Sequence, residues 1–516
     1  YHMKHTKKLL SLLLVLCLLW LTGCSFDDTS DEDLLQEIYG YYQSGKDKTD
    51  APLTSFALPV LQGQTLDPIT CPDGVQQTIG ALLYEGLYAL DTGFTPQPML
   101  AESCTVSGTT CTITLRGGIT FSDGSAVTAS DVVRSLQRAQ SSERYGARLA
   151  GVSRIAAGSG GTVVLTLAYE NQNIAALLDI PIVKAGTETA TAPIGTGPYV
   201  YTAGESGSVS LTRNSSWWKG ESLPLQTIPL ETYKDSDTIA YAFYAREIQL
   251  LTCDLTATTP SNVSGSGAYT DADTTVLQYV GVNTSRPLLA DPAVRRALSL
   301  GIDRAGLVKS FLMGHAAPAQ FPVSPVSPLY PQAQEVSYSP DHFAGAMEEA
   351  GLRTGTQTQT LTLIVNEENS YKVSMASRIA SQLSQYDLRV TVRTMSWSSY
   401  TQALRSGNYD LYYAECRLTA DWDLTPLLAA GGALNYGGAA SDEMTAALTR
   451  WLTCTQDEQT EAMDSLCQVF REQSPILPVC FKRTSVLMTQ GAVETITPTA
   501  ANPFYGLKDW KINFKK

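Results

Sequence analysis

The sequence lacks the basic regions that nucleic-acid-binding proteins use. Lys and Arg number 36 against 50 Asp and Glu, which gives a formal net charge of −14, and no cationic tract follows the first few residues. Phosphate backbones require a cationic protein surface. We therefore expect no nucleic-acid partner.

Histidine is scarce, and no C-x-x-C pair occurs. The chain has 4 histidines, of which only His315 and His342 lie beyond the N-terminal basic segment. Protein-bound zinc and copper need clusters of Cys and His ligands. We therefore expect no metal site and no cofactor.

Sequence patterns of common hydrolases are also missing. No G-x-S-x-G sequence surrounds a strand-to-helix turn, which a serine nucleophile elbow needs, and His342 lies at an expected helix start where a surface role is simplest. No pair of carboxylates stands out for glycoside hydrolysis. We expect that the protein is not an enzyme.

The one long apolar run lies at the N-terminus. Residues 9–21 form 13 almost unbroken apolar positions after Lys4, Lys7 and Lys8. A bilayer crossing takes about 20 residues, so this run fits a secretory signal peptide better than a membrane span. It ends in Leu-Thr-Gly-Cys24, which resembles a bacterial lipobox, with an ordinary signal peptide as the alternative.

This interpretation assigns residues 1–23 to a lipoprotein signal peptide and Cys24 to lipidation. Residues 24–51 are rich in Asp, Ser and Thr and are expected to be a flexible tether. We expect a cell-membrane protein, lipid-anchored and facing outside the cytoplasmic membrane, either extracellular or periplasmic.

Cysteine usage fits an exported protein. The chain has 10 cysteines, and 8 remain after Cys17 and Cys24. An even number permits disulfides outside the cytoplasm. Cys104 and Cys111 flank a Gly-containing turn in an expected β-hairpin, which predicts a disulfide between them.

The composition and length predict a large α/β protein. The hydrophobic fraction is 43%, and 516 residues exceed what one core usually accommodates. Strand-like runs alternate with helical ones, which favours parallel βαβ units. Among the helices we expect Gln76–Leu90, a helix capped at Thr128 that ends near Gln140, and Pro292–Met313.

Ordered short segments resemble a known family. The chain is similar to the family-5 extracellular solute-binding proteins of bacterial ABC importers, a group that includes oligopeptide-, dipeptide- and nickel-binding lipoproteins. The matching segments are TLDP (65–68), LYEGL (83–87), PMLAES (98–103), TITLRGGITFSDGSAVTASDV (112–132), GTGPY (195–199), WWKG (217–220), DPAVRRALSLGIDRAGLV (291–308), GHAAPA (314–319), YSPD (338–341), EAGL (349–352), NYDL (408–411) and SPILP (474–478).

Most of these motifs specify the fold rather than the ligand. Asp123 in FSDG is explained by a turn in any protein, since Gly124 supplies the positive φ. Asp303-Arg304 is most simply a surface pair or a helix cap.

The resemblance implies a fold of the periplasmic-binding-protein type: two α/β lobes, type II and large, with an extra small domain. Lobe I would comprise residues 52–83, 191–282 and 485–516. A small inserted domain, 84–190, would pack on lobe I, and lobe II would comprise 283–484. Ligand would lie between lobes that close by hinge motion.

The implied function is the substrate-binding lipoprotein of an ABC importer that captures peptides or a similar small solute. Its partners would be that ligand and the permease subunits, and we expect a monomer. The alternatives are a receptor for nickel or a metal chelate and, from another class, a peptide-sensing or pheromone-receptor lipoprotein.

Candidate ligand contacts follow the NYDL segment. In peptide-binding members of the family an aspartate after this strand pairs with the ligand's amino terminus, while main-chain groups hold the peptide as an added strand. Asp421 matches that aspartate best, although the intervening run is longer by about two residues. Asp423 and Glu415 are competing candidates.

Other side chains nearby have two interpretations each. Arg417 either binds a ligand carboxylate or neutralises Glu415 or Asp421. Trp397 and Trp422 either line the ligand pocket or belong to the core. Asn435 and Tyr436 either contact ligand from a loop or form a simple turn.

Overall fold

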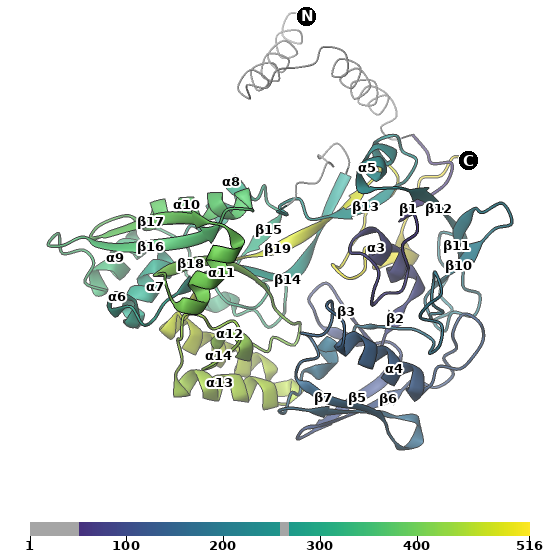
Figure 1. The fold of residues 1–516 in the computed structure, drawn as a ribbon, viewed down its shortest axis with the longest axis horizontal. Coiled ribbons are helices and arrows are strands. Elements are labelled where there is room, and N and C mark those ends of the chain that lie inside the picture. The colour runs from purple at the N-terminus through teal and green to yellow at the C-terminus, as the bar shows by residue number, and fades with distance from the viewer. Residues whose placement is uncertain (1–50, 259–267) are drawn as a thin grey trace, which may run out of the picture.

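The computed structural model describes residues 51–258 and 268–516. The predicted signal peptide, Cys24 and residues 24–50 of the predicted tether lie outside these ranges. Within them, no helix is both long and apolar enough to cross a membrane. Figure 1 shows a large α/β body joined by long strands to a second body, with a smaller body beside both. We call these lobe II, lobe I and the insert, after the predicted ranges, whose boundaries stay a prediction.

Lobe I is built on a four-stranded sheet in the order β1-β12-β11-β10. β1 pairs in parallel with β12, and the remaining neighbours are antiparallel. Helices α3 and α5 pack beside this sheet. The elements are β1 (Leu58–Leu61), α3 (Val75–Leu83), β10 (Tyr199–Ala203), β11 (Val209–Arg213), β12 (Thr227–Tyr233) and α5 (Ser236–Tyr244).

The predicted helix Gln76–Leu90 is wrong beyond Leu83. Tyr84 adopts an extended conformation with φ −127° and ψ 144°, and its backbone N–H caps the helix by donating to the Gly80 carbonyl. Glu85 and Gly86 then pair with β9. The apolar pattern therefore runs through a helix and two short strands.

The insert contains a four-stranded antiparallel sheet in the order β5-β6-β8-β7. The capped helix predicted at Thr128 is confirmed as α4, in which the Thr128 and Asp131 side chains cap each other's backbone N–H groups. The elements are β2 (Glu85–Gly86), β3 (Tyr88–Leu90), β4 (Pro96–Pro98), β5 (Ala101–Ser107), β6 (Thr110–Leu115), α4 (Ala129–Gln140), β7 (Val152–Ala157), β8 (Val163–Leu167) and β9 (Pro181–Ile182), with 3-10 turns at Ser159–Gly161 and Ile174–Leu177.

Strands β5 and β6 form the hairpin expected around the two local cysteines. The Cys104 and Cys111 sulfur atoms lie 3.1 Å apart as thiols. The disulfide between them stays a prediction.

A seven-stranded sheet with the path β13-β19-β14-β18-β16-β17, in which β15 pairs with β19, runs from lobe I into lobe II. Leu250 of β13 belongs to the core of lobe I. β16 is parallel to both β17 and β18, whereas β14 is antiparallel to β18 and β19. The strands are β13 (Leu250–Cys253), β14 (Ala268–Val282), β15 (Ala316–Pro318), β16 (Gln359–Asn366), β17 (Leu388–Met395), β18 (Leu411–Arg417) and β19 (Ile476–Met488).

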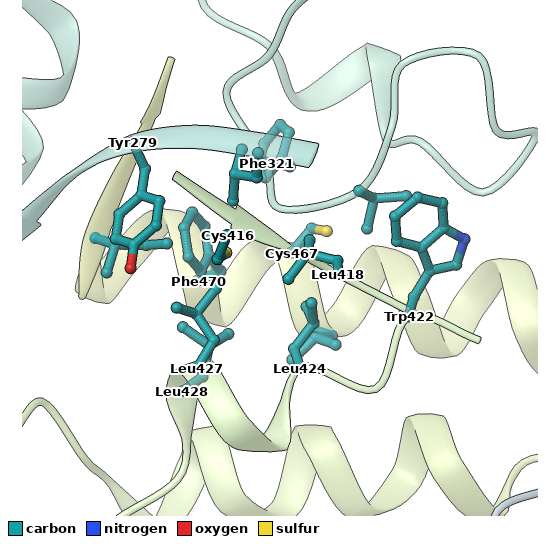
Figure 2. Close-up of a cluster of buried hydrophobic side chains, with 14 of the residues drawn as sticks. Tyr279, Phe321, Cys416, Leu418, Trp422, Leu424, Leu427, Leu428, Cys467 and Phe470 are labelled. Carbon is teal, nitrogen blue, oxygen red and sulfur yellow. The ribbon is translucent and has the colours of Figure 1, made fainter. Parts of the chain in front are cut away.

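Helices cover both faces of this sheet. They are α6 (Pro287–Ala290), α7 (Pro292–Leu300), α8 (Arg304–Phe311), α9 (Pro340–Glu349), α10 (Ser370–Leu383), α11 (Trp397–Ser406), α12 (Thr425–Leu428), α13 (Asp442–Thr453) and α14 (Gln459–Gln473). Single 3-10 turns occur at Gln332–Gln334, Gln456–Glu458 and Leu507–Asp509. One face packs on α6–α10, and the other on α11–α14. Figure 2 shows the second core, to which Cys416, Trp422 and Phe470 of α14 all belong.

Two long strands connect the lobes. Leu477 and Val479 of β19 belong to a core of lobe II, whereas Val486 and Met488 of the same strand belong to the core of lobe I. β14 pairs with β19 along most of its length. A change in the angle between the lobes would therefore bend β14 and β19.

The predicted helix Pro292–Met313 is two helices, α7 and α8. A Cβ at Gly301 would lie 2.6 Å from Leu383, so the chain turns at a point of close packing. Asp303 caps α8 as predicted, accepting from the Gly306 N–H at 3.0 Å. Arg304 is not a surface residue: it is buried and donates to the Pro478 carbonyl at 2.7 Å.

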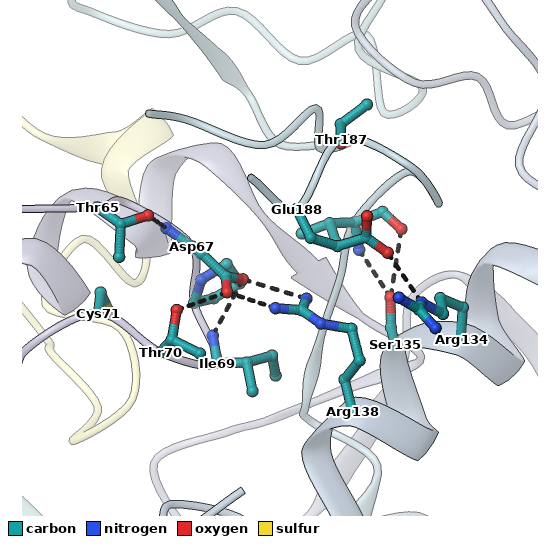
Figure 3. Close-up of polar contacts among 12 residues, drawn as sticks. Thr65, Asp67, Ile69, Thr70, Cys71, Arg134, Ser135, Arg138, Thr187 and Glu188 are labelled. Carbon is teal, nitrogen blue, oxygen red and sulfur yellow. Dashed lines mark hydrogen bonds and ion pairs between the residues drawn. The ribbon is translucent and has the colours of Figure 1, made fainter. Parts of the chain in front are cut away.

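The TLDP segment ties lobe I to the insert. Arg138 of α4 donates to both Asp67 carboxylate oxygens, at 3.3 and 2.5 Å, and Thr70 donates to the same carboxylate at 2.7 Å (Figure 3). Asp67 is almost fully buried. This motif residue therefore holds two parts of the fold together.

Three further family motifs meet at Glu85. Its buried carboxylate accepts from Thr196 Oγ1 at 2.8 Å, from Trp217 Nε1 at 2.9 Å and from Trp218 Nε1 at 2.7 Å. Burial raises the pKa of Glu85, and the three hydrogen bonds oppose that rise. LYEGL, GTGPY and WWKG thus form one structural junction.

Candidate functional site

Three parallel strands of lobe II end at one edge of its sheet. β16, β17 and β18 end at Asn366, Met395 and Arg417. The helix that follows β16 covers one face of the sheet, and the helix that follows β17 covers the other. In open α/β sheets, ligands bind in the crevice outside the carboxyl ends where the helices diverge in this way. We call this the strand-end edge.

Segments of lobe I reach the strand-end edge. Asn369, which caps α10, places its Nδ2 3.4 Å from the Thr256 carbonyl and 3.3 Å from Thr258 Oγ1. Lys482 of β19 donates to Asp254, which follows β13. The edge therefore faces lobe I, as a site between the lobes requires.

Glu415 lies at this edge within a group of polar side chains. Its Oε2 accepts from Gln278 Nε2 at 2.9 Å and lies 3.7 Å from Lys372 Nζ and 3.9 Å from Lys482 Nζ. The side chain keeps 25% of its surface exposed. Of the three predicted acidic candidates, Glu415 is held by cations of the protein.

Arg417 lies two residues farther along β18, so its side chain leaves the same face of the sheet as that of Glu415. It is exposed. Across residues 51–258 and 268–516, no carboxylate forms an ion pair with Arg417. The predicted neutralisation by Glu415 or Asp421 is therefore not seen in this structure.

Asp421 is enclosed by protein. It is 2% exposed, and its carboxylate accepts from Asn171 Nδ2 at 2.8 Å, Thr419 Oγ1 at 2.5 Å and the Asp423 N–H at 3.1 Å. Burial raises the pKa of the Asp421 carboxyl. A ligand ammonium would have to displace one of these donors to reach it.

The loop that contains Asp421 is where the insert docks onto lobe II. Tyr169 donates to Asp423 Oδ2 at 2.5 Å. The Gln172 N–H donates to the Leu452 carbonyl at 2.7 Å. Together with the bond from Asn171, these contacts give Asp421 and Asp423 protein partners from another part of the chain.

The two predicted tryptophans differ in exposure. Trp422 is 2% exposed, with a φ of 53°, and its ring packs edge-on against Phe94 and Phe481. Trp397 is 56% exposed and stacks on Tyr400 with ring centroids 5.7 Å apart. Trp422 is thus a core residue, whereas Trp397 offers an open aromatic face at the strand-end edge.

Asn435 and Tyr436 lie near the opposite end of the strands, where β18 begins. The Tyr436 carbonyl accepts from the hydroxyl of Tyr409, which precedes β18, and the strand from Leu411 to Arg417 is itself about 20 Å long. The Asn435 amide donates to the Ala429 and Ala439 carbonyls within its own loop. This placement argues against a shared ligand site with Arg417 and supports the turn interpretation.

Sequence reasoning missed several side chains at these two places. They are Asp254, Gln278, Lys372 and Lys482 around Glu415, and Asn171 beside Asp421. Gln278 is separated from Glu415 by 137 residues, and Asn171 from Asp421 by 250. No local pattern marks such a pair, because the contact depends on strand order and on the docking of the insert.

His315 lies beside a serine and an aspartate. Its Nδ1 is 3.0 Å from Asp271 Oδ2 and 3.5 Å from Ser485 Oγ, and Ser485 is fully buried. In a catalytic triad the serine and the carboxylate engage opposite ring nitrogens. Here both engage Nδ1, so this group lacks the geometry of a nucleophilic site.

A metal site is not found either. No group of three or more His, Cys, Asp and Glu side chains in the described ranges has the arrangement needed to hold a metal ion.

Comparison with known proteins identifies the family. The sequence pattern of the bacterial extracellular solute-binding proteins, family 5, matches residues 95–429. Among curated relatives, the glutathione-binding protein GsiB of Salmonella paratyphi A is 26% identical over 454 residues, which cover 81% of this chain and 87% of GsiB.

Solved structures share the fold. The nickel ABC transporter protein of Bacillus halodurans superposes with a TM-score of 0.72 at 22% identity, covering 87% of this chain and 98% of that one. The periplasmic murein tripeptide binding protein MppA, in its unliganded open form, superposes with a TM-score of 0.73 at 19% identity, covering 90% of this chain and 98% of MppA. The predicted α/β fold of type II binding proteins is confirmed, and the chain belongs to family 5 of the bacterial extracellular solute-binding proteins.

Proposed function

We propose that this protein is the solute receptor of a bacterial ABC importer and that its ligand is a peptide or a peptide-like solute. A glutathione-binding relative and a murein tripeptide binding protein of the same fold support this ligand class. Both names denote short peptides. In this proposal the receptor delivers its ligand to permease subunits and works as a monomer.

One observation carries the proposal: the strand-end edge gathers groups that suit a peptide and faces lobe I. Arg417 and Trp397 are exposed there, and Glu415 is partly exposed. A peptide presents ionised termini, backbone amides and side chains, which such a mixture of charge and aromatic surface accommodates.

Calorimetric titration of the protein with glutathione and with tri-alanine tests the proposal. We expect saturable binding of one molecule of at least one of them. A ligand at about 100 times its Kd should also stabilise the fold by about 2.7 kcal/mol, which thermal unfolding reports. Binding of a nickel–histidine chelate with no binding of either peptide would contradict the peptide assignment.

For location, we propose that Cys24 carries lipid and tethers the receptor outside the cytoplasmic membrane. Cys24→Ala should move most of the protein from the membrane fraction to the medium or periplasm, because a polar, acidic chain has little membrane affinity without acyl chains. Fractionation with immunoblotting measures this. Cys17→Ala, in the same predicted leader, is the matched control and should stay membrane-bound. Equal retention of both variants would refute lipidation at Cys24.

A further inference from the structure

We infer that Lys372 and Arg417 form a subsite for a ligand carboxylate, on either side of Glu415. This inference rests on the proposed function and names the ligand group that the strand-end edge recognises. It is supported by two cations at that edge whose N–H donors have no hydrogen-bond acceptor among the described residues.

Lys372 has an ammonium group with unused donors. Its side chain is 13% exposed, and its Nζ lies 3.7 Å from Glu415 Oε2, which is an ion pair but too long for a hydrogen bond. Within residues 51–258 and 268–516, Nζ donates no hydrogen bond. An ammonium carries three N–H donors, and a mostly buried one requires acceptors.

Arg417 adds a second cation with free donors. It extends from the face of β18 that Glu415 also occupies, and the described residues provide its guanidinium with neither a hydrogen bond nor an ion pair. A guanidinium presents five N–H donors in a planar fork that matches the two oxygens of a carboxylate.

Two carboxylates at the same edge, by contrast, already have donors. Glu415 accepts from Gln278 at 2.9 Å. Glu368 accepts from Asn366 Nδ2 at 2.9 Å and from the Trp397 N–H at 2.6 Å. Beside these two carboxylates, Lys372 and Arg417 still have unused donors, and a ligand that satisfies those donors must bring acceptor oxygens.

Glu415 cannot satisfy both lysines that flank it. Lys482, buried at 5% side-chain exposure, donates to Asp254 and also lies 3.9 Å from Glu415. One carboxylate is thus shared by two ammonium groups. It keeps Lys372 at the edge and leaves the Lys372 donors for a ligand, and a carboxylate gains strong charge-assisted bonds there.

Equilibrium dialysis with two tripeptide pools tests the subsite. One pool has free carboxyl termini, and the other has the same sequences with amidated termini; mass spectrometry reads what the protein retains. Wild-type protein should prefer the free-acid pool by about 10–100-fold, the range expected for losing hydrogen bonds between charged groups. Arg417→Gln and Lys372→Met should each remove most of this preference, and Lys372→Arg should keep more of it than Lys372→Met.

Arg389→Gln is the matched control. Arg389 is an exposed arginine near the start of β17, at the end of that strand opposite to the strand-end edge. It should leave the preference unchanged. Equal retention of both pools by the wild type, or an unchanged preference in both Arg417→Gln and Lys372→Met, would overturn the subsite while leaving the receptor function standing. Retention of neither pool would overturn the proposed function, and the subsite with it.

Discussion

Replacing Glu85 with alanine is expected to lower the free energy of unfolding by about 3–5 kcal/mol, because it leaves up to three donors unsatisfied in a buried position. These donors are the Thr196 hydroxyl and the indole N–H groups of Trp217 and Trp218, all within 2.9 Å of the carboxylate. Chemical denaturation measures the loss. Glu102→Ala, an exposed glutamate of β5, is the matched control and should change stability little.

Glu85→Gln should lose less stability than Glu85→Ala at neutral pH, because the amide oxygen still accepts hydrogen bonds. The raised pKa of Glu85 also fixes the sign with which the free energy of unfolding depends on pH. Burial raises the pKa of Glu85 in the folded protein, so the native state binds more protons than the unfolded state between the ordinary glutamate pKa and the raised one. Stability should therefore fall as pH rises through that window in the wild type, and this fall should be smaller in Glu85→Gln. Equal stability of Glu85→Ala and wild type would contradict the structural junction.

Replacing Asp421 with alanine is expected to cost about 2–4 kcal/mol of unfolding free energy, because it leaves Asn171 and Thr419 without their buried acceptor. The variant should also loosen the docking of the insert, since Asn171 belongs to it. Hydrogen exchange should become faster around residues 169–173 and 421–423. Asp464→Ala on the exposed surface of α14 is the control.

Asp421→Asn separates hydrogen bonding from charge. Burial raises the folded-state pKa of Asp421, so the wild type should lose stability as pH rises from the ordinary aspartate pKa through the raised one. The Asp421→Asn variant does not lose stability with rising pH in this way. At neutral pH this gain in stability offsets part of the stability lost by weakening the bond to Asn171. An Asp421→Ala variant as stable as wild type, with unchanged exchange at 169–173, would show that the carboxylate does not hold the insert.

The sequence predicted the fold well where local chemistry determines it. The Thr128 cap and the hairpin around Cys104 and Cys111 follow from residues close together in the chain. The helix predicted over 76–90 was too long, because the buried strand pair that begins at Glu85 has the same apolar character as a helix face.

The candidate site was predicted only in part, for a topological reason. Arg417, Glu415 and Trp397 were named from segments next to strands, and parallel pairing brings them to one edge. Lys372 and Gln278 reach Glu415 from other elements, which no spacing in the chain reveals. Tyr436 follows β18 closely in sequence, yet the chain returns through α12 to the other end of that strand.

Native mass spectrometry of the purified protein, incubated with a pool of free tripeptides, tests the central claim most directly. We predict one bound peptide per protein chain in the wild type and in Arg389→Gln, and strongly reduced occupancy in Arg417→Gln. The same occupancy in Arg417→Gln as in the wild type, or no bound peptide in any of the three, would contradict the claim that this receptor holds a peptide-like solute at the strand-end edge.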